Sequence, residues 1–296
     1  MNLDYLKTFY TSINENSISK AAKILHMSQP GVSIQLQALE KELGFLLLIR
    51  SNKGVELTDA GRIVYDYAVS LLSIQKNIHH DLDSLKNNVQ EMVVSSCTTV
   101  GSYALPCSLY TFKNKNPNIK ILLDITNSKN VITNLLNNNT KIGIIHGNPK
   151  VNDIYTEKIT SSHLYLVCKN VNNNISVTLE QLTKLPLIVR EKGSGTRQCI
   201  EENLIKENLD LNQMNIVLEL CSTEAIKSAV LSGKGFAFLP ELSIKQELAT
   251  KSLKIITIED KKFESHFYLA YLKEKPPKGP EKCFFDFVKS SKRGFC

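Results

Sequence analysis

The sequence predicts an α/β protein that begins with an all-α winged helix-turn-helix and a long linker helix. Three observations support this prediction. Two helical runs flank the break Ser28-Gln29-Pro30, apolar residues recur at three- and four-residue steps over about 59–89, and strand-like and helical stretches alternate from residue 91 onward. A chain of 296 residues is long enough for two domains with a connector.

The first 44 residues predict three helices. Ser19 is expected to cap a second helix over 20–25, and Ser28 a third. The third helix tolerates Pro30 in its first turn, because the N–H that proline lacks would have no intrahelical partner. Its apolar face is expected to be buried, as is that of the first helix. The apolar face of the first helix consists of Leu3, Leu6, Phe9, Tyr10 and Ile13. That of the third helix consists of Val32, Leu36, Leu39 and Leu43.

A short hairpin and a long helix are expected next. Two β-prone pieces after Gly44 flank the turn-like tetrapeptide SNKG, which completes the pattern of a winged helix-turn-helix. Thr58 can cap a helix over about 59–89, whose apolar residues form a seam of the coiled-coil type. The seam favours a homodimer, and the alternative is a helix packed on its own domain. Its members are Val64, Tyr67, Leu71, Ile74, Ile78 and Leu85.

From residue 91 the pattern is that of an α/β domain with mostly parallel sheets, long enough for two lobes. Helical stretches lie between most of the expected strands. The strands are expected at 92–97, 119–125, 141–146, 164–168, 185–189, 215–220, 235–239, 253–258 and 267–272.

The charge distribution limits how the first domain could bind nucleic acid. The chain has a net charge of +7, but residues 1–58 carry six basic and five acidic groups, and residues 59–90 carry three and four. The basic excess therefore lies after residue 90, where it indicates an anionic ligand or simply a solvated lysine-rich surface. DNA binding by the first domain must depend on where its residues stand.

The third helix carries side chains suited to that task. The second helix of a helix-turn-helix enters the major groove, where glutamine can bond adenine and serine can contact bases or phosphates. Basic residues beside the hairpin can contact phosphates, which position the protein without reading sequence. Each residue taken alone could equally be a solvated surface residue. The candidates are Ser28, Gln29, Pro30, Ser33, Gln35, Arg50 and Lys53.

The stretch SISKAAKILHMSQPGVSIQLQALEKELGFLLLIRSNKGVELTDAG (17–61) resembles the DNA-binding region of LysR-type transcriptional regulators. It departs from the family pattern at Leu48, where phenylalanine is usual, and at Gly31, where alanine is common. The resemblance implies a two-lobed effector domain similar to periplasmic binding proteins. It also implies a homodimer or homotetramer that binds promoter DNA, answers a small-molecule co-inducer and contacts RNA polymerase.

On this basis the expected parts are a DNA-binding domain (1–58), a linker and dimerisation helix (59–90) and an effector-binding domain (91–296). The effector domain is expected to divide into lobe I (about 91–162 with 267–296) and lobe II (about 163–266). In such folds the ligand lies between the lobes, at strand ends and helix starts.

Three hydroxyl-rich helix starts and two arginines predict a small anion as effector. A serine such as Ser222 could instead be an ordinary helix cap. The run REKGSGTR…ELCSTEAIKSAVLSGKGFAFLP looks similar to a branch of the family associated with sulfur assimilation, for which sulfite or a related oxyanion would suit. The candidate effector residues are Cys97, Thr98, Thr99, His146, Arg190, Ser194, Gly195, Thr196, Arg197, Ser222 and Thr223.

Other functions are weighed against this one. Seven cysteines without a CxxC pair, and no signal peptide or membrane span, favour reduced thiols in the cytoplasm. A thiol-responsive regulator of the same fold stays an alternative, and a solute-binding receptor is the alternative from another class. No GxSxG elbow, metal-ligand cluster or phosphate-cradling lysine motif is present, so neither an enzyme nor a cofactor or metal is expected.

Overall fold

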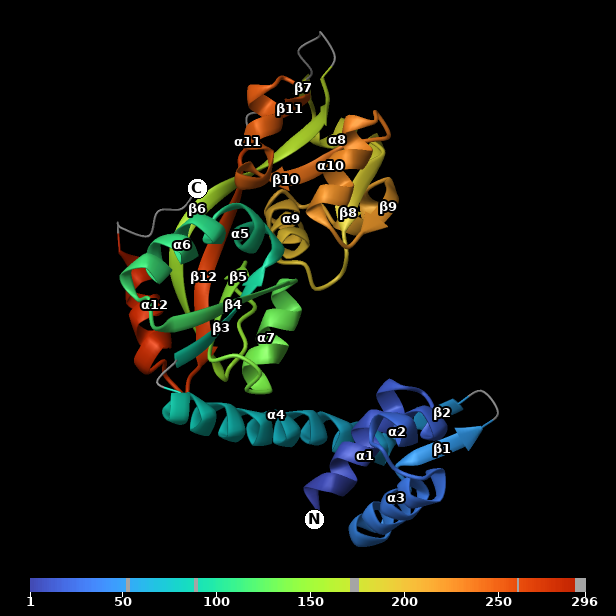
Figure 1. The fold of residues 1–296 in the computed structure, drawn as a ribbon. Helices are drawn as coiled ribbons and strands as arrows, with labels where there is room; N and C mark the ends of the chain where they lie inside the picture. The colour runs from blue at the N-terminus through green and yellow to red at the C-terminus, as the bar shows by residue number, and fades with distance from the viewer. Residues whose placement is uncertain (52–53, 88–89, 171–175, 260, 291–296) are drawn as a thin grey trace. The chain divides into compact units, whose positions relative to one another are not determined.

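The computed structural model describes residues 1–51, 54–87, 90–170, 176–259 and 261–290, apart from the side chains of 80, 81 and 83–87. The chain forms two compact units, shown as a ribbon in Figure 1. Unit 1 comprises 1–87 with 137–139, and unit 2 comprises 88–136 with 140–296. Each unit has its own hydrophobic core.

Unit 1 is the winged helix-turn-helix that the sequence predicts. Its three helices are α1 (Leu3–Asn14), α2 (Ile18–Ile24) and α3 (Gln29–Leu43). The wing is an antiparallel pair, β1 (Leu48–Ser51) and β2 (Gly54–Leu57). Its core combines residues from all five elements. The buried members are Leu6, Phe9, Ala22, Val32, Leu36, Leu39, Leu47, Leu48, Val55 and Ala68.

The helix caps follow the sequence with one exception. Ser28 caps α3, because its Oγ accepts the N–H of Gly31 at 3.1 Å. Gly44 ends α3 with φ +74°, a left-handed conformation that glycine adopts without steric cost. The prediction that Ser19 caps α2 is wrong: Ser17 does so, accepting the N–H of Lys20 at 3.3 Å.

The long helix α4 (Asp59–Asn87) begins where predicted, with Thr58 Oγ1 accepting the N–H of Gly61 at 2.9 Å. The expected seam divides into two sets. Val64 and Leu71 pack against the core of unit 1, together with Tyr65 and Ala68. The other set is exposed in this single chain, and the side chain of Leu85 lies outside the described residues. The exposed set is Tyr67, Ile74, Ile78 and the neighbouring Leu82.

Unit 2 is built on an eight-stranded sheet with the order β4-β3-β5-β12-β6-β11-β7, in which β10 also pairs with β6. A separate parallel pair is formed by β8 (Leu187–Arg190) and β9 (Ile216–Leu220). The bounds in the large sheet are β3 (Gln90–Cys97), β4 (Ile119–Thr126), β5 (Ile142–His146), β6 (Ile154–Lys169), β7 (Ser176–Val177), β10 (Ala237–Pro240), β11 (Leu253–Ile258) and β12 (Phe263–Leu272).

The two long strands β6 and β12 pass through both halves of unit 2 (Figure 1). We call the half that contains β3–β5 lobe I and the half that contains β7–β11 lobe II. The expectation of mostly parallel sheets is corrected here: β6 pairs antiparallel with β10, β11 and β12, and β12 pairs antiparallel with β5. These long antiparallel strands join the lobes into one sheet.

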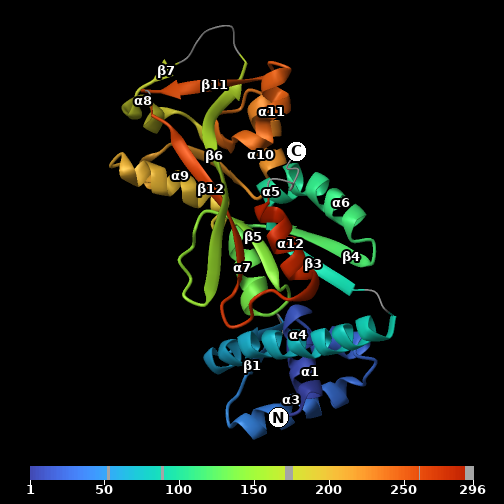
Figure 2. The same cartoon turned by 90° about the vertical axis from the view of Figure 1, so that its left-hand side faces the viewer.

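Helices cover both faces of the sheet in lobe I. In Figure 2, α6 (Leu105–Lys115) and α12 (Gly279–Lys289) lie on one side and α7 (Ser128–Leu136) on the other. Side chains alternate along the strands, so Ile144 packs toward α6 and α12, and Ile145 packs toward α7. The remaining helices are α5 (Thr98–Tyr103), α8 (Leu179–Lys184), α9 (Gly195–Lys206), η1 (Leu211–Gln213), α10 (Thr223–Leu231) and α11 (Glu241–Ala249).

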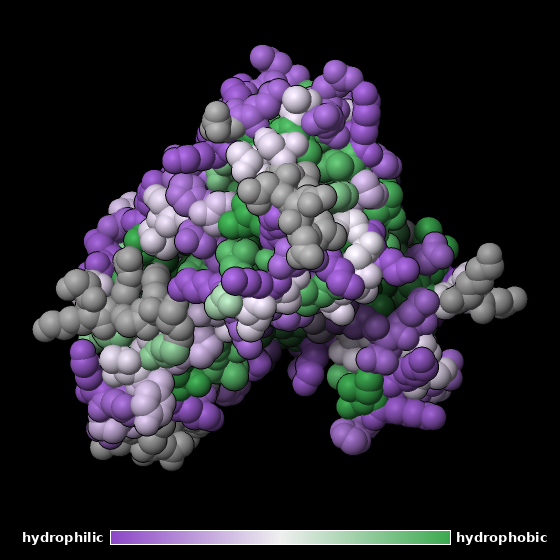
Figure 3. Space-filling view, turned by 90° about the horizontal axis from the view of Figure 1, so that it is seen from above, coloured by the Kyte–Doolittle hydropathy of each residue, from purple (hydrophilic) through white to green (hydrophobic). Residues whose placement is uncertain are grey.

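The surface seen in Figure 3 is covered largely by hydrophilic residues, with hydrophobic ones scattered among them. Such scattered exposed apolar residues are normal on a folded protein. Among the described residues, no helix has the length and apolar character that crossing a bilayer requires.

Candidate functional site

The start of α3 presents several of the predicted DNA-binding residues. Gln29 and Pro30 are exposed and Ser33 is half-buried. The Ser19 hydroxyl donates to Gln29 Oε1 at 3.2 Å, which holds the amide near the helix start. Ser28 supplies the cap described above, so its hydroxyl is already bonded to the backbone. Gln29 and Ser33 are thus the polar side chains here that are placed to meet a ligand.

Gln35 stands on the other flank of α3 and bonds within the protein. The hydroxyl of the buried Thr8 donates to Gln35 Oε1 at 2.5 Å, which joins α1 to α3. Arg50 is exposed on β1, whereas Lys53 lies outside the described residues. A base-reading role for Gln35 therefore requires its amide to leave Thr8 or to use its N–H₂ group.

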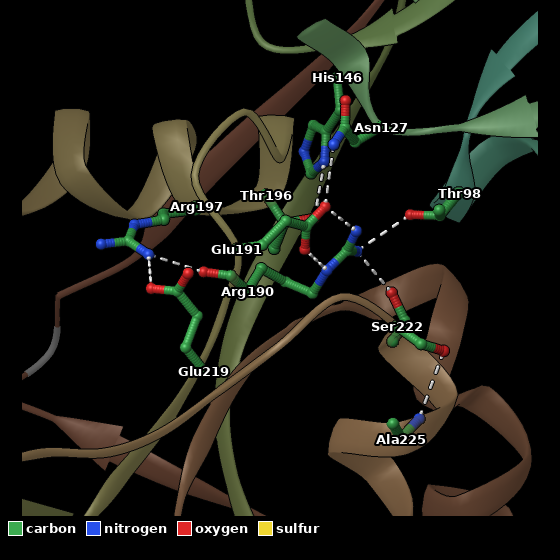
Figure 4. Close-up of polar contacts among 11 residues, drawn as sticks. Thr98, Asn127, His146, Arg190, Glu191, Thr196, Arg197, Glu219, Ser222 and Ala225 are labelled. Atoms are coloured by element: carbon green, nitrogen blue, oxygen red, sulfur yellow. Dashed lines mark hydrogen bonds and ion pairs between the residues drawn. The ribbon is translucent and has the colours of Figure 1, made fainter. Parts of the chain in front are cut away.

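A second cluster of polar residues joins the two lobes of unit 2 (Figure 4). Arg190, at the end of β8, is only 2% exposed. Its Nε donates to Glu191 Oε2 at 2.7 Å and its Nη2 to Glu191 Oε1 at 3.0 Å. Its Nη1 donates to Thr98 Oγ1 of lobe I and Thr223 Oγ1 of lobe II, both at 3.0 Å. The structure thus brings together three of the predicted effector residues.

His146 ends β5 and is buried against the same cluster. Its Nδ1 lies 3.1 Å from Thr196 Oγ1, and its ring stacks on Phe267 with centroids 4.3 Å apart. Its Nε2 is buried and has no hydrogen-bond partner among the described residues. Burial, reinforced by the positive charge of Arg190, lowers the pKa of His146 to about 3. The imidazole is therefore neutral at physiological pH.

The lobes approach each other closely at the start of α9. A Cβ added to Gly195 would lie 2.0 Å from the carbonyl oxygen of His146 and 2.5 Å from Ser128 Oγ. The Ser128 hydroxyl itself bonds the backbone of His146, and the N–H of Lys129 donates to the carbonyl of Gly193 at 3.1 Å. Only glycine fits at position 195, so its role is to let the two backbones meet.

Other predicted effector residues have partners within the protein. Arg197 donates to the carbonyl of Arg190 at 3.0 Å and forms ion pairs with Glu201 and Glu219. Figure 4 shows it turned toward Glu219, on the far side of Arg190 from Thr98.

Ser222 caps α10 by accepting the N–H of Ala225 at 3.4 Å, as the simpler interpretation expects. Cys97, Thr99 and Ser194 are buried at the edges of the cluster. The part that these residues play in binding stays a prediction.

A pocket of about 580 Å³ lies beside the cluster, between α7 of lobe I and the start of α9 of lobe II. Lys129, Lys192 and Arg197 line it with a single carboxylate, that of Glu201. Because Arg197 is already paired with Glu201 and Glu219, Lys129 and Lys192 supply the excess positive charge of the pocket, which favours a negatively charged small molecule. Of the residues that line this pocket, sequence reasoning singled out Ser194 and Arg197.

Several residues at the cluster were missed from the sequence. Asn127 Nδ2 of lobe I donates to Glu191 Oε1 at 3.2 Å. Glu191 therefore accepts hydrogen bonds from Arg190 and from lobe I at the same time. Tyr103 of lobe I donates its hydroxyl to Glu224 of lobe II, and Lys227 lies 5.1 Å over the Tyr103 ring. The position of Glu191 directly after Arg190 in the sequence could have indicated that the two side chains form an ion pair. Tyr103 carried no comparable signal.

Cys97 and Cys199 show the features of inert thiols, whereas Cys221 and Cys283 are exposed. Burial raises the pKa of Cys97 to about 11 and that of Cys199 to about 12, so both stay protonated and unreactive at neutral pH. Cys97, Cys168, Cys199, Cys221 and Cys283 are free. Cys107 is disulfide-bonded, which departs from the expectation of reduced thiols throughout. Among the described residues, no group of three or more His, Cys, Asp or Glu side chains could hold a metal ion.

Two family models match this chain. One described as "Bacterial regulatory helix-turn-helix protein, lysR family" matches residues 3–62, and one described as "LysR substrate binding domain" matches residues 88–293. The second covers more than half of the chain. The chain therefore belongs to the LysR family of transcriptional regulators, and the alternative of a solute-binding receptor is set aside.

Individual relatives agree with this family. A "Probable RuBisCO transcriptional regulator" of Phaeodactylum tricornutum is 31% identical over 265 residues, which is 87% of this chain and 86% of that protein. The crystal structure of CbnR, a LysR family transcriptional regulator, has a TM-score of 0.73 at 21% identity over 98% of each chain. The Synechocystis PCC6803 CcmR regulatory domain in complex with 2-PG has a TM-score of 0.61 at 25% identity, over 68% of this chain and 96% of that one. None of these gives support to the expected kinship with a sulfur-assimilation branch.

Proposed function

We propose that this LysR-type regulator reads promoter DNA with the start of α3 and changes its activity when a small anion binds between lobes I and II. The observation that supports the anion is the pocket lined by Lys129, Lys192 and Arg197, next to the buried Arg190 cluster that joins the lobes. The working parts are 1–58 for DNA, 59–90 for assembly and 91–296 for the effector. We also propose that the protein acts in the cytoplasm as a homodimer or homotetramer that contacts RNA polymerase.

The DNA proposal rests on Gln29 and Ser33. Both side chains stand in the first turns of α3, and a glutamine amide can donate to and accept from adenine at once. Arg50 adds a phosphate contact that positions the domain. Because unit 1 has little net charge to attract DNA, its affinity depends on such placed contacts.

The DNA proposal is tested by replacing Gln29 and Ser33 by alanine. Duplexes selected by the full-length protein from a random pool serve as the specific DNA, and a random duplex of equal length as the non-specific one. Each variant should lose about fivefold or more in affinity for selected DNA and little for random DNA, since a lost base contact affects only the specific complex. Gln246→Ala, on an exposed face of α11, is the matched control. Equal losses on both DNAs would remove the base-reading role.

The effector proposal concerns an anion of the size of 2-PG, the ligand named in the CcmR structure. Lys129, Lys192 and Arg197, which line the pocket, would contact it. The neutral His146, whose Nε2 has no partner among the described residues, would offer a hydrogen bond nearby. An anion in this position would compete with the Glu201 and Glu219 carboxylates for Arg197, which also donates to the carbonyl of Arg190, and the contacts that join the lobes at Arg190 would then change.

Thermal unfolding with 2-PG, sulfite and inorganic phosphate tests this site. An anion that binds should raise the unfolding temperature of the wild type. Lys192→Gln should weaken that anion about fivefold, and Arg197→Ala should abolish the shift, because each removes a cation from the pocket. Lys234→Gln, on an exposed loop of lobe II, is the control. A shift that survives Arg197→Ala unchanged would move the anion site elsewhere.

A further inference from the structure

One exposed side chain on α3 has no place in the DNA contacts proposed so far. Ile34 is 65% exposed, although Val32 and Leu36 on either side of it are buried. Each is two residues away, which is about 200° around an α-helix. Ile34 therefore points directly away from the core of unit 1, at the centre of the outer face of α3.

The first three turns of α3, which contain Ile34, carry no charged residue. The first 11 residues of α3 read QPGVSIQLQAL, and no charged residue occurs before Glu40. Pro30 and Gln37, which flank Ile34 one turn before and after it on the outer face, are both exposed. In its first three turns, this face therefore presents amide groups, a hydroxyl and one branched alkyl group to a DNA groove, and the exposed Lys41 follows only in the last turn.

An exposed isoleucine does not serve the helix itself. β-Branched residues lose side-chain freedom in helices, so a straight-chain polar residue would suit a solvated position better. Other apolar side chains of unit 1 are exposed too, such as Ile24 and Leu46, and isolated cases need no explanation. What distinguishes Ile34 is its place on the face that a helix-turn-helix inserts into the major groove.

We infer that Ile34 reads the C5-methyl group of a pyrimidine in the major groove, which in unmodified DNA is thymine; this rests on the proposed role of α3 in binding DNA. The alkyl group can neither donate nor accept a hydrogen bond, so it cannot recognise the polar edges of guanine or adenine. The thymine methyl is the apolar group that the major groove displays. A 5-methylcytosine presents the same methyl from another base.

The test removes single methyl groups from the DNA. Duplexes are first selected from a random pool by the full-length protein. Each thymine of the selected site is then replaced by deoxyuridine, which keeps base pairing and every groove hydrogen bond. Wild-type affinity should fall about fivefold at one thymine of each half-site, because the apolar contact is lost. Ile34→Ala should bind both forms of that site equally.

Two further measurements test whether the methyl group itself is recognised and whether Ile34 is the residue that recognises it. At the sensitive position, a cytosine should bind more weakly than a 5-methylcytosine in the wild type, and Ile34→Ala should not distinguish them. Ile63→Ala, a matched change at a position 62% exposed on α4, should keep the full response to deoxyuridine. Thermal unfolding of each variant checks that the fold is kept.

The outcomes separate the two proposals. If the selection enriches a site but no deoxyuridine weakens wild-type binding, or if Ile34→Ala responds as the wild type does, the methyl-reading role is overturned and DNA binding by α3 stands. If the selection enriches no sequence at all, the proposed reading of promoter DNA fails, and the role of Ile34 fails with it.

Discussion

The buried imidazole of His146 shows how position alone sets the charge of one residue. The ring is enclosed by Phe267 and the start of α9, and Arg190 adds a positive charge nearby. Both effects oppose protonation, and they lower the pKa of His146 to about 3. A neutral ring can donate through one nitrogen and accept through the other, so its unpartnered Nε2 suits a polar ligand.

His146 should make the protein less stable in mild acid. Its folded-state pKa of about 3 lies below the unfolded value of about 6.5, so the unfolded chain takes up the proton first as the pH falls. The stability contributed by the neutral His146 is therefore fully present above about pH 6.5 and decreases as the pH falls toward 3. Between pH 7 and pH 5 the contribution to the free energy of unfolding should fall by about 2 kcal/mol. Urea unfolding at the two pH values measures it.

A variant pair isolates this effect from other groups that titrate. His146→Gln should lose most of the 2 kcal/mol difference, because glutamine does not take up a proton. His79→Gln, at an exposed position of α4, should keep the wild-type difference. If His146→Gln retained the full dependence on pH, the buried imidazole would not be its cause.

The sequence predicted part of this cluster and missed the rest for a physical reason. Thr98 and Arg190 were each expected at the cleft between the lobes, because both stand where a strand ends, and the structure brings them into contact. Glu191 was missed because the direction of its side chain depends on Asn127 in the other lobe. The apolar periodicity of the sequence predicts the path of the backbone. It does not predict the partner of a side chain at a contact between lobes, because that partner is distant in the sequence.

At the scale of elements, predictions from periodicity were the most successful. The three helices, hairpin and long helix of unit 1 occur where expected, since each is defined by a local apolar pattern. The strand expected at 164–168 is instead β6, Ile154–Lys169, and the polar run Thr160-Ser161-Ser162 hid its first half. Ser17 and Ser19 are chemically equal candidates for a cap, and the backbone of the preceding turn decided between them.

The bond between Thr8 and Gln35 makes a prediction about how α1 and α3 hold together. Gln35→Ala should destabilise unit 1 by about 1 kcal/mol, because the buried Thr8 hydroxyl loses its acceptor. For a domain of this size that is a fall in unfolding temperature of about 4–8 °C. Gln37→Ala, an exposed change on the same helix, should leave the temperature within about 1 °C. Lost DNA affinity at unchanged stability would instead give Gln35 a base-reading role.

At the scale of the whole molecule, the distribution of charge determines how DNA affinity must arise. Non-specific attraction to DNA grows with the number of phosphates that basic groups neutralise. Residues 1–58 have one basic group more than acidic ones, so a single unit 1 attracts DNA weakly. Two copies held together would double the contacts and match two half-sites. The exposed set on α4 (Tyr67, Ile74, Ile78 and Leu82) is a surface by which two copies could associate.

Replacing Ile78 tests that assembly. The side chain is 54% exposed in the single chain, so Ile78→Lys should not unfold the protein, yet a lysine amine would be costly to bury against a second copy. Analytical ultracentrifugation should show a shift toward monomer, and affinity for selected DNA should fall at least tenfold as the second half-site contact is lost. His79→Lys introduces the same side chain at the neighbouring exposed position and should leave both properties unchanged. An Ile78→Lys protein that sediments as the wild type does would place the contact between copies on another surface.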